Sequence, residues 1–442
     1  MDSRDHQLVD AYVFGYPLVY DLSSVMTISA NGMGSLPPAP FNSFAFGDTL
    51  ATPGDRFVSV NNDTVYVIAQ LDLSGGPVLL HVPDTGGRYY VLQFVDAWTN
   101  NFAYVGSRAT GTGEGEFLIA GPGWSGEVPG GARLITAPTD VATIVGRLAT
   151  DGGADLERAV ALQQGFILTP LEGNGVPRGI PHPSPDVPDA LKFWEMLRLW
   201  SLAFPPAAED QAVLASLSDY GLTDLGEPYL NVSRELEERL AAGFAAGRAH
   251  VEEIAASGDA PTVNGWRANP HMFDYNLDHF EIGAIDSPEW KLSDRAASYA
   301  QRAIAARNGL WGNHGYEAVY SEVFVDADGE QLNGAHRYEL RLTELPPADA
   351  FWSITMYDMP DYYLVANPIE RYSIGDRTPG VVTGDDGSLT ITIQHEQPAD
   401  AAAAANWLPS PAGDFRPMLR VYAPRAEVIN GTFRMPPITR VG

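Results

Sequence analysis

The sequence of 442 residues contains no cysteine and only two lysines, Lys192 and Lys291. Without cysteine, the chain can form no disulfide, thiolate nucleophile, zinc–thiolate site or iron–sulfur cluster. With two lysines, it offers few candidates for a Schiff-base mechanism. No uninterrupted apolar run approaches the ~18 residues that a membrane-spanning helix needs. These absences exclude several common classes of catalytic site.

Basic residues are scarce as well, since 27 lysines and arginines stand against 56 acidic residues, a formal charge of −29. A surface this acidic repels a phosphate backbone and an anionic lipid leaflet, so neither nucleic acid nor a membrane is expected as a partner. The first eleven residues include Asp2, Asp5 and Asp10 and lack the basic region that precedes the apolar core of a secretory signal. We therefore expect a cytoplasmic protein with a small-molecule ligand, and a homo-oligomer is possible.

Apolar spacing divides the chain into four parts. Residues 1–30 have helical spacing, and residues 31–150 contain short extended runs with a hairpin signature at 77–95. Residues 151–315 are predicted to be mainly helical, as in the stripe Leu236, Leu240 and Phe244. Residues 316–442 alternate with a period of two, which is typical of a half-buried antiparallel sheet. The sequence predicts a mainly β protein with a helical middle.

Polar side chains gather among aromatic ones in a few segments. G-x-S-x-G, H-E-x-x-H and phosphate-binding Gly-Lys-Ser/Thr motifs are all missing from the sequence. The dense segments are 61–66, 93–101, and a C-terminal group made of 352–358, 371–377 and 406–409. Because binding residues concentrate on loops and strand ends, these segments are the candidates for a site.

The same segments carry a family resemblance. The stretches Asn61–Tyr66, Asp96–Asn100, Arg371–Arg377 and Asn406–Pro409, the last running into Leu419–Tyr422, resemble two domains that occur together in bacterial proteins. These are the domains of unknown function 1254 (N-terminal) and 1214 (C-terminal). The resemblance implies an immunoglobulin-like β sandwich, an α-helical insert and a jelly-roll-like β sandwich. It implies no catalytic residues, so the roles below come from side-chain chemistry.

We predict that polar residues of both β modules meet at a shared cleft. Paired carboxylates can act as acid and base, and tyrosines can donate protons. The predicted catalytic residues are Asp63, Asp96, Tyr66, Tyr357 and Asp358. Arginine holds carboxylates and tryptophan stacks on rings, so the predicted substrate-binding residues are Asn62, Trp98, Asn100, Arg371, Tyr372, Arg377 and Trp407.

Each candidate also has a purely structural interpretation. Residues 62–64 can be a loop that satisfies its own backbone, and 96–101 a strand end capped by asparagines. Arg371 or Arg377 can form a structural ion pair with Asp376 or Asp358. Trp407, which precedes Leu408-Pro409, is more typical of a core residue than of a stacking surface.

The leading hypothesis is a metal- and cofactor-independent enzyme that performs hydrolysis or elimination on a small hydroxylated or carboxylated molecule. One alternative is a non-catalytic module that binds carbohydrate or another small ligand, and another is a β-sandwich assembly protein. A histidine-ligated metalloenzyme is a further alternative, although the spacing gives it no support. Its candidate ligands are His271, His279, His314, His336 and His395.

Overall fold

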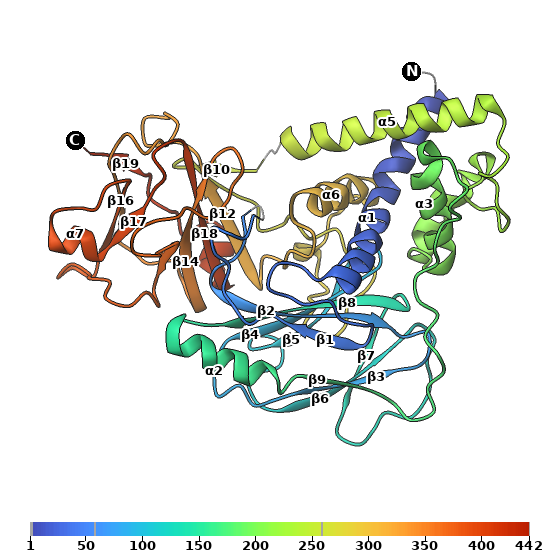
Figure 1. Cartoon of the computed structure of the whole chain (residues 1–442), viewed down its shortest axis with the longest axis horizontal. Helices are drawn as coiled ribbons and strands as arrows, with labels where there is room; N and C mark the ends of the chain where they lie inside the picture. The colour runs from blue at the N-terminus through green and yellow to red at the C-terminus, as the bar shows by residue number, and fades with distance from the viewer. Residues whose placement is uncertain (1–2, 57–58, 258–259, 442) are drawn as a thin grey trace.

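Four β-sheets and a group of helices make up the computed structural model, which describes residues 3–56, 59–257 and 260–441 (Figure 1). Two sheets belong to the N-terminal part of the chain and two to the C-terminal part, and most helices come from the beginning and the middle. The prediction of a mainly β protein with a helical middle is confirmed. Within these described ranges, no helix combines the length and apolarity needed to cross a membrane.

The N-terminal β module consists of a five-stranded and a four-stranded sheet with a shared core. The first sheet has the order β1 (Ser43–Phe46), β2 (Thr64–Asp72), β8 (Val141–Ala149), β4 (Tyr90–Asp96), β5 (Asn101–Gly106). The second has the order β7 (Arg133–Thr136), β6 (Gly115–Ala120), β3 (Val78–Val82), β9 (Ile167–Pro170). Alternate residues of β3 (Val78, Leu80 and Val82) are buried against residues of the larger sheet. Helix α2 (Gly153–Gln163) covers one edge.

The C-terminal β module also combines two sheets. The larger has the order β10 (Thr262–Val263), β11 (Trp266–Ala268), β12 (Ala318–Val323), β18 (Phe415–Pro424), β14 (Ala348–Asp358), β15 (Ser373–Gly375). The smaller has the order β17 (Trp407–Pro409), β16 (Leu389–Gln394), β13 (Tyr338–Leu342), β19 (Thr439–Arg440). The predicted alternation of Leu389, Ile391 and Ile393 is present, and all three residues lie in the core between the sheets. The short helices α7 (Ala401–Ala405) and α8 (Ala426–Ile429) lie in connections.

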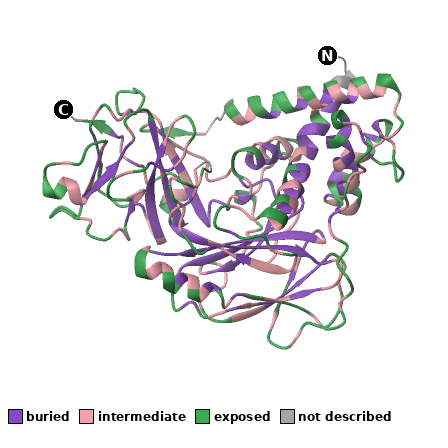
Figure 2. Ribbon diagram, viewed as in Figure 1, coloured by how far each residue is buried: buried purple, intermediate pink, exposed green. Residues whose placement is uncertain are grey.

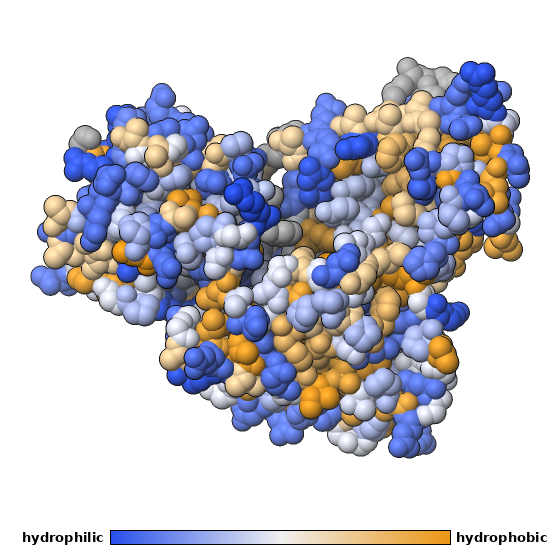
Figure 3. All heavy atoms as spheres, in the orientation of Figure 1, coloured by the Kyte–Doolittle hydropathy of each residue, from blue (hydrophilic) through white to orange (hydrophobic). Residues whose placement is uncertain are grey.

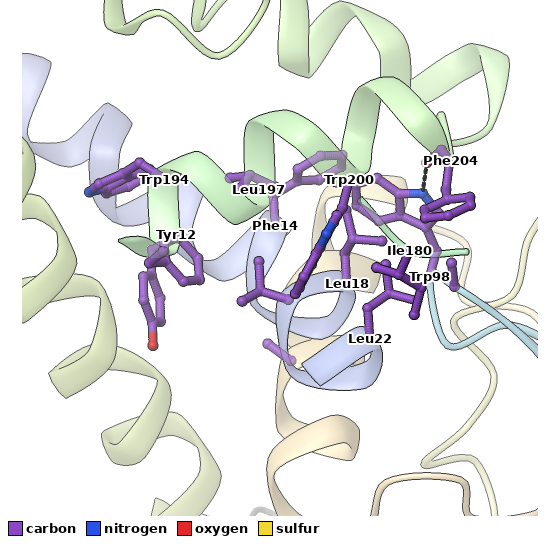
Figure 4. Packing of buried hydrophobic residues seen from close by; sticks show 14 of the residues in the cluster. Tyr12, Phe14, Leu18, Leu22, Trp98, Ile180, Trp194, Leu197, Trp200 and Phe204 are labelled. Atoms are coloured by element: carbon purple, nitrogen blue, oxygen red, sulfur yellow. Dashed lines mark hydrogen bonds between the residues drawn. The ribbon is translucent and has the colours of Figure 1, made fainter. Parts of the chain in front are cut away.

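The helices form a third core on the other face of the five-stranded sheet. Helix α1 (Ser3–Asn31) packs against α3 (Lys192–Ala203), α5 (Arg234–Ser257) and α6 (Arg295–Gly309), and a short α4 (Gln211–Ala215) lies beside them. Figure 4 shows Leu197 and Trp200 of α3 beside Phe14 and Leu18 of α1, with Trp194 further along α3 near Tyr12. Ile68, Val95 and Val145 of the sheet join this core.

Burial on both faces explains the composition of the central strands. Every residue of β4 and β8 is buried, because one face of each strand meets the four-stranded sheet and the other meets the helices (Figure 2). Strands covered on both faces are apolar almost throughout rather than alternating. A polar residue that remains in such a strand, such as Arg147, must find its partners inside the protein.

Candidate functional site

The six-stranded sheet has one apolar and one polar face. Its apolar face, with Ile354 and Leu419, belongs to the core of the C-terminal module. The cross-strand pairs Ser353–Arg420, Phe351–Tyr422 and Tyr357–Arg416 share the opposite face, because directly paired residues point to the same side of a sheet. These six side chains are nevertheless buried, which means that another part of the chain covers them.

Residues 59–63, which precede β2, cover this polar face. The guanidinium of Arg420 donates to the carbonyl oxygen of Ser59 at 2.8 Å, and the hydroxyl of Tyr357 donates to the carbonyl oxygen of Val60 at 2.6 Å. Arg416 also donates to the hydroxyl of Ser59. The C-terminal sheet therefore fixes the backbone that carries Asp63.

The Asp63 carboxylate is held through only one of its oxygens. Oδ2 accepts hydrogen bonds from the hydroxyls of Ser353 at 2.7 Å and Tyr422 at 3.4 Å, and the residue is only 4% exposed. Oδ1 accepts no hydrogen bond from any residue that the structure describes. Because no described residue donates to it, Oδ1 is available for ligand binding or proton transfer.

Asp63 lies at a cleft of about 550 Å³ between the two β modules. The N-terminal side contributes Leu50–Thr52, Asn62, Asp63 and Thr150–Gly152, and the C-terminal side contributes Trp352, Ser353, Ile369–Ser373, Gly375 and Arg377–Pro379. This volume lies in the range of about 300–1,000 Å³ that is usual for small-molecule sites. In Figure 3, the visible face is hollowed where the C-terminal module meets the rest of the molecule.

Two arginines with different surroundings line the cleft. Arg377 forms an ion pair with Asp151 at 3.1 Å, and its guanidinium stacks 3.5 Å from the ring centroid of Phe351. Arg371 donates from Nη1 to the carbonyl oxygens of Ala405 and Trp407 at 2.8 and 3.0 Å. No acidic group within the described ranges pairs with Arg371, and burial lowers its pKa. Its remaining donors can serve an anionic group.

The other C-terminal candidates divide between the cleft and the interior. Tyr372 lines the cleft, and burial raises the pKa of its hydroxyl, which remains protonated at neutral pH. The hydroxyl of Tyr357 donates to the backbone of residues 59–63, and the carboxylate of Asp358 accepts a hydrogen bond from the backbone N–H of Tyr363 at 2.7 Å. Trp407 is buried and donates from Nε1 to the carbonyl oxygen of Gln394 at 2.8 Å, which agrees with the structural alternative for this residue.

The structure does not bring Asp96, Trp98 and Asn100 to the cleft. Oδ1 of Asp96 accepts the backbone N–H groups of Trp98 and Asn100 at 2.9 and 2.8 Å, so this carboxylate caps its own loop. Trp98 packs into the helical core and donates to the carbonyl oxygen of Phe204 (Figure 4). The three residues border a separate space of about 10 Å³, roughly enough for one water molecule.

Tyr66 also lies away from the lining residues of the cleft. It pairs with Arg147 across strands β2 and β8, and the Arg147 guanidinium lies 5.6 Å from the centroid of its ring. Asn62, by contrast, lines the cleft and donates from Nδ2 to the carbonyl oxygen of Ala51 at 2.6 Å. Of the residues predicted from the sequence, the structure thus gathers Asn62, Asp63, Arg371, Tyr372 and Arg377 at one cleft.

The candidate metal ligands stay apart. Among the described residues, no three His, Asp or Glu side chains lie close enough together to hold a metal ion. His314 is buried beside the hydroxyls of Tyr104 and Tyr316, each 3.0 Å from its Nδ1, and burial lowers its pKa to about 3. His271 pairs with Asp274 at 2.6 Å.

The sequence prediction did not include Ser353, Tyr422 and Asp151. The first two lie in strands whose alternation places polar residues on every second position, a pattern that indicates a polar face but does not show what covers it. Asp151 lies in the short connection between β8 and α2, and nothing in its local sequence marks it as a partner of Arg377.

Comparisons with known proteins agree on the family and are silent on activity. Residues 41–170 match the model described as "Protein of unknown function (DUF1254)", and residues 317–426 match "Protein of unknown function (DUF1214)". No curated protein matches the chain.

Two solved structures are similar over nearly all of the chain. The crystal structure of the VPA0106 protein from Vibrio parahaemolyticus is 23% identical, with a TM-score of 0.75 and complete coverage of both chains, which shows a shared fold. A putative uncharacterized protein from Burkholderia cenocepacia is 11% identical with a TM-score of 0.44, covering 98% of this chain and 88% of the other. With both family models in the expected order, the chain belongs to the family of proteins that combine DUF1254 with DUF1214.

Proposed function

We propose that the protein is an enzyme that acts on a small hydroxylated or carboxylated molecule in the cleft between its β modules. Asp63 is the general base in this proposal, and the reaction is a hydrolysis or an elimination. The observation that carries it is Oδ1 of Asp63, a carboxylate oxygen that accepts no hydrogen bond from any described residue, on a side chain that lines a cleft of about 550 Å³. A base must reach the proton that it removes, and Oδ1 is the oxygen not already engaged by Ser353 and Tyr422.

The other lining residues have complementary roles. Arg371 binds an anionic group of the substrate through its remaining donors, and Arg377, already paired with Asp151, lines the same side of the cleft. Tyr372 is the candidate proton donor, because the residue lines the cleft and burial raises the pKa of its hydroxyl, which stays protonated at neutral pH. Asn62 orients substrate hydroxyls.

The experiment starts with a panel of small hydroxy acids, lactones and esters, assayed for product with the whole protein. Once a substrate is found, Asp63→Asn should lower kcat by at least about 100-fold, the usual contribution of a general base. Asn keeps an oxygen that can accept from Ser353, so the melting temperature should change little. Asp386→Asn, an exposed carboxylate paired with Arg341, is the control and should leave turnover unchanged. Full turnover by the Asp63 variant would refute the assignment.

A second candidate function is non-catalytic binding of a small ligand. The positions of the other two predicted carboxylates favour it. Asp96 and Asp358 accept hydrogen bonds from backbone N–H groups outside the cleft. Asp63 therefore has no second predicted carboxylate beside it to complete an acid–base pair. Binding should then quench tryptophan fluorescence through Trp352, which lines the cleft, with no product formed.

The remaining expectations belong to the same proposal. We infer that the N-terminal module is an immunoglobulin-like sandwich and the C-terminal one a jelly-roll-like sandwich, supported by the presence of two sheets in each. We also infer a cytoplasmic location and a small-molecule partner without nucleic acid or membrane, supported by the charge of −29. A homo-oligomer remains part of the proposal and can be measured by light scattering.

A further inference from the structure

Arg147 is a buried cation without an anion. It is 8% exposed, and no acidic side chain in the described part of the chain lies within ion-pair distance of it. Its guanidinium donates to Oε1 of Gln93 at 2.9 Å and to the carbonyl oxygen of Trp311 at 3.0 Å, which are neutral acceptors. Burying an unpaired charge is expensive, and this chain has twice as many acidic as basic residues with which to pair it.

Three tyrosine hydroxyls near Arg147 form no hydrogen bond with any residue that the structure describes. The phenols of Tyr66, Tyr89 and Tyr320 all lie within electrostatic range of its guanidinium. The Tyr89 hydroxyl is fully buried and unsatisfied, and those of Tyr66 and Tyr320 bond to no described residue. Tyr66 and Tyr320 are only half-buried, so the cluster is partly exposed to solvent.

Asn313 adds a further free donor. The residue is 1% exposed, its Oδ1 lies 3.5 Å from Nη1 of Arg147, and its Nδ2 has no partner. Buried polar groups almost always find a partner, so each unsatisfied group needs an explanation. Here the buried unsatisfied groups are the Asn313 amide N–H and the Tyr89 hydroxyl, which lie beside a guanidinium without a counter-ion. Each of these groups can donate a hydrogen bond, and a single negatively charged acceptor would serve all of them.

We propose that Arg147, Tyr66, Tyr89, Tyr320 and Asn313 bind an oxyanion, the carboxylate or phosphate of a small ligand. Strands β2 and β8 of the N-terminal module supply Tyr66 and Arg147, and β12 of the C-terminal module supplies Tyr320. The loop that follows α6 supplies Asn313. An oxyanion bound here touches both modules, so its binding stabilises their contact.

Two carboxyl groups neighbour the cluster, and neither fills the place of the ligand. Asp63 meets it only through Tyr422, whose hydroxyl lies 3.4 Å from Oδ2, and that oxygen is also held by Ser353. The carboxylate of Glu317 helps to raise the pKa of Tyr89, but burial raises the pKa of Glu317 itself to about 7, so it is mostly neutral at pH 6. The site is therefore best tested at pH 6.

The proposed oxyanion site does not depend on the function proposed for the cleft. Arg147, Tyr66, Tyr89 and Tyr320 are absent from the residues that line the cleft. Failure of Asp63→Asn to change turnover would leave the oxyanion site intact, and the reverse also holds.

The test compares the melting temperature of the whole protein in acetate, phosphate and chloride at equal ionic strength and pH 6. We expect acetate or phosphate to raise the wild-type melting temperature above its value in chloride, and the more effective of the two identifies the anionic group. In Tyr66→Phe/Tyr320→Phe, the dissociation constant derived from the anion titration should rise at least tenfold. Because neither hydroxyl has a partner in the protein, the melting temperature in chloride should stay within a few degrees of the wild type.

One control variant and one further test variant keep the result specific. The control, Tyr20→Phe, removes a hydroxyl from a side chain that is 40% exposed, and it should leave the anion titration unchanged. General salting effects of phosphate act equally on the wild type, the double phenylalanine variant and Tyr20→Phe, so they cancel when the melting temperatures of the three are compared. Arg147→Lys keeps the charge but loses the planar fork, and it should weaken the anion as well. A wild-type response no greater than that to chloride, or an equal response in the double phenylalanine variant, would overturn the proposal.

Discussion

Glu317 should make the protein less stable as the pH rises through neutrality. The residue is 1% exposed, and its carboxylate accepts no hydrogen bond from any residue in the described ranges. Burial raises its pKa from 4.5 to about 7, with Arg108 acting in the opposite direction. Replacing it with glutamine removes the charge while nearly preserving the volume, so Glu317→Gln isolates the cost of ionisation.

The magnitude follows from the two pKa values. Because the folded-state pKa is the higher one, the folded protein binds the proton more tightly, and its contribution to stability is complete below about pH 4.5. The contribution is lost as the pH rises toward and past 7. One pKa unit corresponds to about 1.4 kcal/mol, so the full loss is roughly 3 kcal/mol, most of it between pH 5 and pH 8.

The assay is urea unfolding at pH 5 and pH 8 of the wild type, Glu317→Gln and Glu339→Gln, which is an exposed residue of β13. The difference in unfolding free energy between Glu317→Gln and the wild type should be more favourable at pH 8 than at pH 5 by about 2–3 kcal/mol. Any pH-independent cost of the glutamine amide cancels in this comparison. The Glu339 variant should show no such change. A Glu317→Gln curve parallel to that of the wild type between the two pH values would refute the reasoning.

Two further predictions concern stability. Arg88 donates two hydrogen bonds to the carboxylate of Asp155, at 2.7 and 2.6 Å, and they hold the pKa of that carboxyl well below 3.8. Asp155→Asn should therefore lower the free energy of unfolding by roughly 2 kcal/mol at pH 7. This difference from the wild type should shrink as the pH falls below about 4, which unfolding measured across an acid titration will test. In the edge strand β15, a Cβ on Gly375 would lie 2.1 Å from the carbonyl oxygen of Trp352, so Gly375→Ala should lower the free energy of thermal unfolding by about 1–3 kcal/mol. A Cβ on Gly130 would have no heavy atom within 4 Å, so Gly130→Ala should be nearly neutral. Equal effects of the two substitutions would contradict the packing.

Some of the candidate site could be predicted from residue chemistry alone. The sequence predicts Asp63 and Arg377 as site residues, because carboxylates and guanidinium groups on loops and strand ends are typical of binding sites. The structure places both at one cleft. The sequence could not show that Ser353 and Tyr422 hold Asp63, because these contacts span 290 and 359 residues. Such pairings depend on how the two sheets dock, which no local pattern encodes.

Local sequence determined the elements, because the spacing of apolar residues fixes which positions a strand or helix can bury. The period of two at Leu389, Ile391 and Ile393 and the helical spacing of residues 1–30 both became regular structure in the predicted form. Tertiary structure decided which polar residues meet. Asp96, Trp98 and Asn100 are residue types that are common in binding sites. The helices that pack over the five-stranded sheet nevertheless enclose them. Among the described residues that the sequence predicts for the site, Asn62, Asp63, Arg371, Tyr372 and Arg377 line the cleft at the junction of the two modules, where neither core covers them.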